Sequence, residues 1–464
     1  MSVRWVSVSF VLSLAVLSVY AIAAPRNGDL ITGNPRGLLR TYVSGGGGID
    51  PANAFFQSLG TNGRSCNTCH VLEAGWGTSV TRIRARFEAT SGTDPIFRLV
   101  DGANSPLEDV STEAKRREAY SMLLNYGVIR VGLPIPQNAE FTLTAVEDPY
   151  DFASAEQLSL FRRPLPSTNL RFITGVMWDA RETTEPFLPP MDEGEAYDIL
   201  VESLTNQARG AILGHAQAAS PPTAEQLAEI VAFEMSLTTA QFRDRQAGRL
   251  KGGNAIGGPR VLANQHFFVG INDPFGNNPT GVSFDTNASM VLFDGFGSRR
   301  GNGRRQRARA AIERGEKLFN TLPINITGVA GLNDALGQES VQGHCTTCHN
   351  APNVGNHSVG APLDIGVSDA SRREAGFPLY TLTNILTGET RQTTDPGLAL
   401  ITGKWADIGK FKGPTLRGLA ARAPYFHNGL AANLGEVVDF YDSRFNIGIT
   451  PQQRADLVAF LSAL

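Results

Sequence analysis

The sequence predicts a mainly α-helical fold of two similar domains, with long loops and a small β insertion. The pattern C-x-x-C-H occurs twice, at residues 66–70 and 345–349. Each occurrence is followed downstream by a similar amphipathic segment, at residues 223–237 and 450–464. Loops are expected because the 464 residues include 49 glycines and 26 prolines, which favour turns over long helices.

The two C-x-x-C-H motifs predict the covalent attachment of two haem groups. In this arrangement two thiols bind one haem, and the adjacent imidazole coordinates its iron. A disulfide would leave both histidines unexplained, and a zinc site would need further Cys or His ligands nearby. The motifs use all four cysteines of the chain. The predicted haem-binding residues are Cys66, Cys69, His70, Cys345, Cys348 and His349.

Residues 1–23 are typical of a secretory signal peptide. Arg4 precedes an apolar run that ends in Ala21-Ile22-Ala23, an A-x-A cleavage pattern. An uncleaved membrane anchor is the alternative, because the run is near the lower length limit for spanning. No later segment is long and apolar enough to span. We therefore expect a periplasmic or secreted protein without a membrane span after cleavage.

The charge composition argues against a nucleic-acid-binding protein. The chain has 41 Lys and Arg against 44 Asp and Glu, a formal net charge of -3, so no global positive field would collect phosphates. A local basic run lies between residues 299 and 309. It is a solvated helix start, a docking surface for an acidic electron-transfer partner, or a source of one or two arginines that pair haem propionates.

Residue patterns predict the other elements. Residues 24–50 are polar and Gly-rich, which predicts a loose arm. Apolar spacing predicts helices at residues 50–59, 111–127, 223–237, 307–320, 434–442 and 450–464, and short strands are expected at 127–136 and 139–147.

The two amphipathic segments indicate an internal duplication. Aligned without a gap, they match at Thr223/Thr450, Gln226/Gln453, Ala228/Ala455 and the Val-Ala-Phe triplets at 231–233 and 458–460. The threonine that begins each segment and the glutamine three residues later form a capping-box pattern at a helix start. We predict an N-terminal haem domain at residues 24–247 with an insertion at about 100–165, a linker or insertion at 248–304, and a C-terminal haem domain at 305–464.

The methionine positions limit how the second iron can be ligated. The six methionines lie at residues 1, 122, 177, 191, 235 and 290, all before the second motif. A His/Met haem built wholly from the C-terminal domain is therefore excluded. The candidate sixth ligands in that domain are His344, His357, His427, Tyr380, Tyr425 and Tyr441.

Tyr441 is a notable candidate because it shares an apolar helix face with Val437 and Val438. That face should point inward. On periodicity alone, a core tyrosine with a hydrogen-bonded hydroxyl group is favoured over a ligand.

Residues 411–429 (FKGPTLRGLAARAPYFHNG) and 434–442 (LGEVVDFYD) resemble the di-haem cytochrome c peroxidase/MauG superfamily. The resemblance implies two cytochrome c-like haem domains. In the MauG-like branch a tyrosine at the position of Tyr441 ligates the second iron, and His427 packs near the haem. The segment MWDARE at 177–182 resembles a segment whose tryptophan lies between the haems, which implies that Trp178 carries charge between them.

The resemblance also implies a distal pocket over the first haem. Gln207 in NQARGA matches the distal glutamine, and Ala211 stands where a proline is usual. The position of the acid–base glutamate is occupied by Gln217, which cannot transfer a proton. His215 can, because its ordinary pKa lies near neutrality. The alternatives are that His215 ligates the first iron at rest or is a surface histidine.

The resemblance implies a di-haem oxidoreductase that reacts with hydrogen peroxide at the N-terminal haem and shares oxidising equivalents with a His/Tyr-ligated C-terminal haem. The expected reductant is a small cytochrome c, a cupredoxin, or an organic or protein substrate. The rivals are an oxygenase that activates O2 and a non-catalytic electron-transfer cytochrome. Calcium is a further candidate cofactor, although the family's calcium-binding asparagine aligns with Arg163.

Overall fold

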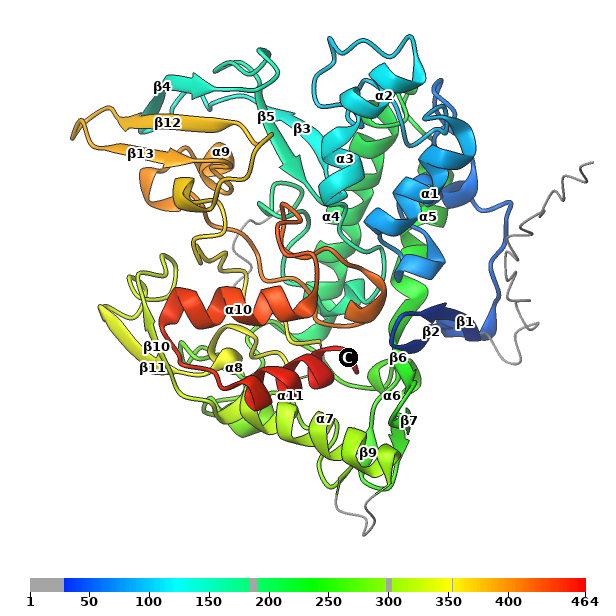
Figure 1. Cartoon of the computed structure of the whole chain (residues 1–464), viewed down its shortest axis with the longest axis vertical. Helices are drawn as coiled ribbons and strands as arrows, with labels where there is room; N and C mark the ends of the chain where they lie inside the picture. The colour runs from blue at the N-terminus through cyan, green and yellow to red at the C-terminus, as the bar shows by residue number, and fades with distance from the viewer. Residues whose placement is uncertain (1–28, 184–190, 298–302, 353) are drawn as a thin grey trace, which may run out of the picture.

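The computed structural model describes residues 29–183, 191–297, 303–352 and 354–464. The predicted signal peptide lies outside these ranges, as do the first two arginines of the basic run. Figure 1 shows α4 and α5 running together in the upper half of the molecule, and α7, α10 and α11 gathered in the lower half. None of the described helices is long and apolar enough to cross a membrane.

The prediction of a mainly α-helical fold is wrong. Helices make up 33% and strands 18% of the structure, and several sheets are present. The strands are β1 (Asp29–Asn34), β2 (Gly37–Val43), β3 (Ile129–Leu133), β4 (Phe141–Glu147), β5 (Leu158–Arg162), β6 (Leu237–Asp244), β7 (Gly248–Arg249), β8 (Lys251–Gly252), β9 (Ala255–Ile256), β10 (Ile324–Thr327), β11 (Ser340–Gly343), β12 (Leu379–Asn384) and β13 (Thr390–Thr393).

The prediction of a loose arm is also wrong, because residues 29–43 form a β-hairpin. β1 pairs with β2, and β2 pairs with β6, about two hundred residues later. Leu39 is 1% exposed, so the hairpin contributes to the core. The strand β4 similarly pairs with β12. The sequence pattern did not reveal these pairings, because the partner of each strand lies far away in the chain.

Five of the six predicted helices are present: the one at 111–127 as α2 and α3, and those at 223–237, 307–320, 434–442 and 450–464 as α5, α7, α10 and α11. The helices of the described residues are α1 (Val80–Thr90), α2 (Glu113–Ala119), α3 (Ser121–Tyr126), α4 (Glu193–Gly214), α5 (Ala224–Ser236), α6 (Pro259–Leu262), α7 (Arg304–Thr321), α8 (Cys345–Cys348), α9 (Ala399–Thr402), α10 (Leu434–Phe445) and α11 (Pro451–Leu461). At residues 50–59 only a 3-10 turn forms, at Ala54–Phe56. The predicted strands at 127–136 and 139–147 are confirmed as β3 and β4.

The two helices α5 and α11 begin in the same way, as the repeat predicts. Thr223 and Thr450 each cap the helix by accepting a hydrogen bond from the backbone N–H of the glutamine three residues later. Each glutamine side chain accepts from the backbone N–H of its threonine at 2.9 Å. These reciprocal hydrogen bonds supply acceptors for two backbone N–H groups that otherwise have no partner at a helix start.

Part of the predicted linker packs into the C-terminal core. Met290, Phe293 and Phe296 are buried with Phe460 of α11 in one apolar cluster. In the basic run, Arg309 lies over the ring of Phe296 and donates to a backbone carbonyl. The predicted domain boundaries themselves stay a prediction.

A buried ion network ties β5 to the C-terminal half. Arg162 donates from Nε and Nη2 to the two carboxylate oxygens of Asp395, at 2.7 and 2.8 Å. Its remaining nitrogen binds Asp179, which also accepts from Arg181 at 3.0 Å. Asp179 directly follows Trp178, so the network fixes the loop that carries this tryptophan.

Removing the cation of this network should destabilise the protein. We expect Arg162→Met to lower the free energy of unfolding by about 3–5 kcal/mol, because it leaves two buried carboxylates without their main partner. The matched control is Arg454→Met, whose partner Asp439 is about half exposed; it should cost about 0.2–1 kcal/mol. Denaturant midpoints of the haem-loaded proteins provide the comparison, and equal losses would contradict this role of the network.

Candidate functional site

The residues of the first cysteine motif line a cavity next to α4. Cys66, Cys69 and His70 all line this cavity. His70 Nδ1 lies 3.2 Å from the carbonyl oxygen of Trp76. As donor in that bond, Nδ1 would leave Nε2 available to a metal. Burial lowers the pKa of His70 to about 4, which keeps the imidazole neutral, as a ligand must be.

The second motif forms an equivalent cavity in the C-terminal half. The short helix α8 carries Cys345 and Cys348, and His349 follows it. His349 Nδ1 lies 2.6 Å from the carbonyl oxygen of Gly355. Burial lowers the pKa of this histidine as well. Both cavities therefore combine two thiols with one oriented, neutral imidazole.

The alternatives to haem find no support in the geometry. All four cysteines lie within the described residues and are free thiols, not joined in disulfides. No group of three or more His, Cys, Asp or Glu that could hold a metal ion occurs among the described residues. The side chains thus offer a zinc ion no further ligands.

The linings of both cavities fit a large apolar group that carries carboxylate groups. Apolar residues dominate both linings, and basic residues lie among them. Lys412 and Arg163 line both cavities, and Arg422 lines the second. Burial lowers the pKa of Lys412 to about 8 and that of Arg422 to about 10. Arg422 Nη2 is buried without a hydrogen-bond partner. Haem propionates would supply the missing negative charge.

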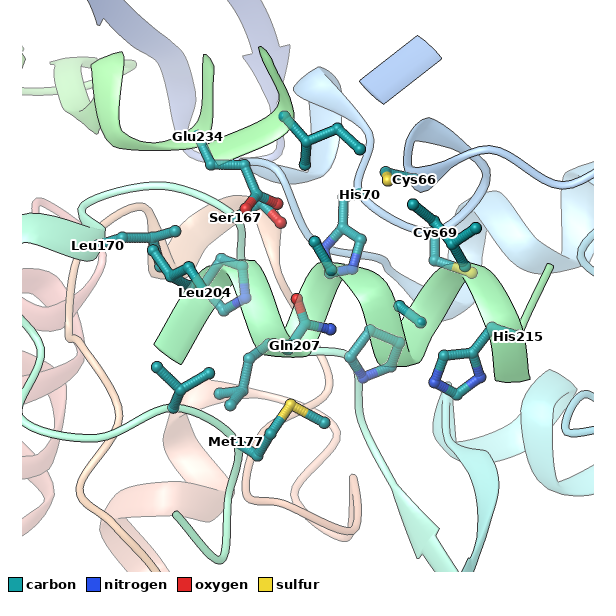
Figure 2. Close-up of a pocket in the computed structure, with 18 of the residues that line it drawn as sticks. Cys66, Cys69, His70, Ser167, Leu170, Met177, Leu204, Gln207, His215 and Glu234 are labelled. Atoms are coloured by element: carbon teal, nitrogen blue, oxygen red, sulfur yellow. The ribbon is translucent and has the colours of Figure 1, made fainter. Parts of the chain in front are cut away.

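The distal side of the first cavity is formed by α4. Figure 2 shows Gln207 on this helix, reaching toward His70, and His215 at the end of the helix. Both side chains line the cavity. Ala211 also lines it and leaves room where a larger side chain would project. Gln217 lies outside the cavity lining and is exposed, and its side-chain oxygen accepts a hydrogen bond from Asn62 at 3.2 Å.

A carboxylate that the sequence did not reveal holds His215. The Nδ1 atom of His215 lies 2.5 Å from Asp101, and Asp101 also pairs with Arg64. Burial alone would raise the pKa of Asp101, but its bonds to His215 and Arg64 outweigh this effect and lower it. The side chain of Asp101 is 5% exposed. Asp101 therefore remains ionised and orients the imidazole.

Trp178 lines both cavities. Its indole N–H donates to the carbonyl oxygen of Arg163 at 2.8 Å, and its own carbonyl accepts from the backbone of Lys412 at 2.9 Å. The ring packs edge-on against His427, with centroids 6.2 Å apart. This position between the cavities is what charge transfer through Trp178 would require.

Five of the six candidate ligands for the second iron line the second cavity. They are His344, His357, His427, Tyr425 and Tyr441. Tyr380 lies elsewhere, with its hydroxyl group donating to the carbonyl of Ser159 at 2.8 Å. Tyr425 donates to the carbonyl of Leu419 at 2.8 Å. Burial raises the pKa of Tyr441, and both cysteines of the second motif contribute to the shift. The phenol therefore lies close to the motif.

A second buried carboxyl group was missed as well. Glu234, on α5, lines the first cavity and is 5% exposed. The repeat alignment contained a signal for it, because the matched position in α11 is Leu461. Asp101 had no such signal, because nothing near it in sequence points to His215.

No protein-family model matches the chain. Several curated relatives do. A protein named cytochrome-c peroxidase IdrP1 from Pseudomonas sp. (strain SCT) is 32% identical over 202 residues, which is 39% of this chain and 45% of that protein. Cytochrome-c peroxidase IdrP2 from Denitromonas iodatirespirans is 34% identical over 134 residues, 26% of this chain and 36% of that protein.

A third relative is cytochrome c551 peroxidase from Nitrosomonas europaea, which is 31% identical over 142 residues, 29% of this chain and 36% of that protein. The chain thus spans less than half the length of the curated relatives that it matches. Among solved structures, a MauG-like protein associated with microbial copper homeostasis covers 88% of this chain and 85% of its own, at 16% identity and a TM-score of 0.34. That score is too low for an argument about shared architecture.

Each of the two cavities combines a C-x-x-C-H motif with an apolar lining that contains basic residues, an arrangement that fits a covalently attached haem. Over the matched segments, the chain is similar to proteins named cytochrome c peroxidases.

Proposed function

We propose that the chain is an exported di-haem c-type oxidoreductase that reduces hydrogen peroxide. The first haem would bind to Cys66, Cys69 and His70 and be the reactive one. Reduction of peroxide to two waters takes up two electrons and two protons. The haem irons would supply the electron chemistry when bound, and the chain would bind peroxide and move protons.

The proton transfers are assigned to His215. Cleavage of the O–O bond needs a group that takes a proton from one oxygen and returns it to the other. Since Asp101 holds Nδ1, the exchange is assigned to the other ring nitrogen of His215. Gln207 would orient the peroxide through its side-chain amide. The exposed Gln217 has no part in the proposal.

The second cavity is assigned to electron transfer. His349 and Tyr441, which line the same cavity, would both hold this iron, and this would close it to peroxide. Trp178 would carry charge between the two haems. The electron donor would be a small cytochrome c, a cupredoxin, or an organic or protein substrate. The domain arrangement proposed for this division is residues 24–247 and 305–464, joined by 248–304.

The observation that carries the proposal is the pairing of His215 with buried Asp101 at the cavity beside Gln207. This pairing supplies an acid–base group where the sequence offers no glutamate. A surface histidine would not need a buried carboxylate.

The test compares two oxidants. The protein, reduced with a small cytochrome c, is mixed either with peroxide under argon or with air-saturated buffer without peroxide. We expect the cytochrome to be oxidised only with peroxide. Consumption of O2 without peroxide would support an oxygenase instead, and inactivity with both oxidants would favour an electron-transfer cytochrome.

A further inference from the structure

The buried carboxyl group of Glu234 has no role in the peroxide chemistry proposed above. It lies on the inner face of α5, and its Oε2 atom is buried without a hydrogen-bond partner. Figure 2 shows this carboxyl group beside Ser167, away from His215. A buried carboxylate with one oxygen left without a partner is costly, so the surroundings of Glu234 favour its protonated form.

Apolar clusters pack against α5, the helix that carries Glu234. The elements packed against α5 contribute Phe55, Leu170 and Leu204 to the surrounding apolar clusters. The titratable group that faces Glu234 is Cys66, whose thiol would be consumed by haem attachment. Burial raises the pKa of Glu234 to about 7, against the opposing effect of the Ser167 hydroxyl group.

The repeat provides an internal comparison between the two cavities. With Thr223 aligned to Thr450, Ile230 matches Leu457 and Glu234 matches Leu461. Ile230 and Glu234 line the first cavity, and their counterparts Leu457 and Leu461 line the second cavity. The repeat register therefore also holds in space. At this position the first cavity has an ionisable group and the second has a hydrocarbon.

We propose that Glu234 takes up one proton from solvent when the first haem gains one electron, and releases it on oxidation. The electron adds negative charge inside a cavity of low polarity, which favours the neutral carboxyl group over the carboxylate. The added proton offsets the added charge. The second haem, beside Leu461, has no such group at the matched position.

This inference rests only on the haem-attachment part of the proposed function. It requires a haem at Cys66 and Cys69, not reactivity with peroxide. A protein that fails to reduce peroxide but has a pH-dependent first haem would therefore refute the proposed function and leave the inference standing.

The test is spectroelectrochemical titration of the haem-loaded protein between pH 5.5 and 8.5. We expect the reduction equilibrium of the first haem to become up to tenfold less favourable for each unit of rising pH near neutrality, which is about 59 mV for one electron. The second haem is expected to change much less. The steepest dependence should lie around pH 7, where Glu234 exchanges its proton.

Variants assign the effect to Glu234. Glu234→Gln and Glu234→Leu should both flatten the dependence, and the leucine variant makes the first cavity match the second. Glu225→Gln, on the exposed start of the same helix, should leave the slope unchanged. Ser167→Ala should move the steep region to higher pH, because it removes a bond that favours the carboxylate. A flat wild-type profile, or an unchanged slope in Glu234→Gln, would overturn the proposal.

Discussion

Replacing His215 with glutamine is expected to lower the second-order rate constant for reaction with hydrogen peroxide by a factor of about 10²–10⁴, the usual contribution of a general acid–base group. Glutamine has a similar reach and keeps hydrogen-bonding capacity, but it cannot accept and return a proton. Stopped-flow absorbance of the ferric protein mixed with peroxide measures this constant directly.

Two further variants separate catalysis from structure. Asp101→Asn should also slow the reaction, because it removes the charge that orients His215 while retaining the side-chain shape. His266→Gln, whose side chain is 92% exposed, should react at the wild-type rate. A wild-type rate in His215→Gln would contradict the assignment. A faster reaction would instead identify His215 as a resting ligand of the first iron.

Replacing Tyr441 with methionine should raise the midpoint potential of the second haem by hundreds of millivolts, since axial ligands set haem potentials over a range of about 0.8 V. A phenolate is a hard, anionic donor that stabilises ferric iron, whereas a thioether is neutral and soft. Burial raises the pKa of the Tyr441 phenol in the absence of a metal. The phenolate would therefore form only when it binds the haem iron. Redox titration followed by visible absorbance reports the change.

The matched control for this variant is Tyr425→Phe. Tyr425 lines the same cavity, but its hydroxyl group already donates to a backbone carbonyl. Its removal should leave the potential nearly unchanged. If Tyr441→Met left the potential unchanged, the ligand would have to be sought among the remaining side chains of the cavity, such as His357 and His427.

The sequence predicted best what is encoded locally. The capping boxes of α5 and α11 are formed by neighbouring residues, and the inward face of α10 follows from helical spacing. Both were predicted before the structure, and the structure contains them. The cysteine motifs likewise carry their chemistry within five residues. The roles of Gln207, His215, Trp178 and Tyr441 stay predictions, which the geometry makes testable.

The sequence failed where partners are distant. β2 depends on β6, and His215 depends on Asp101, 114 residues earlier. No local sequence pattern indicates either pair, so the β2–β6 pairing and the charged partner of His215 were both missed. Glu234 is a different case, because comparing the two repeats position by position would have found it opposite Leu461.

The most direct test of the division into a reactive and a closed haem is electron paramagnetic resonance of the ferric protein. Spectra are recorded before and after the addition of one equivalent of hydrogen peroxide. We expect a high-spin signal from the first haem that disappears with peroxide, and a low-spin signal from the second haem if Tyr441 is its ligand. Two low-spin signals that do not change with peroxide would contradict it.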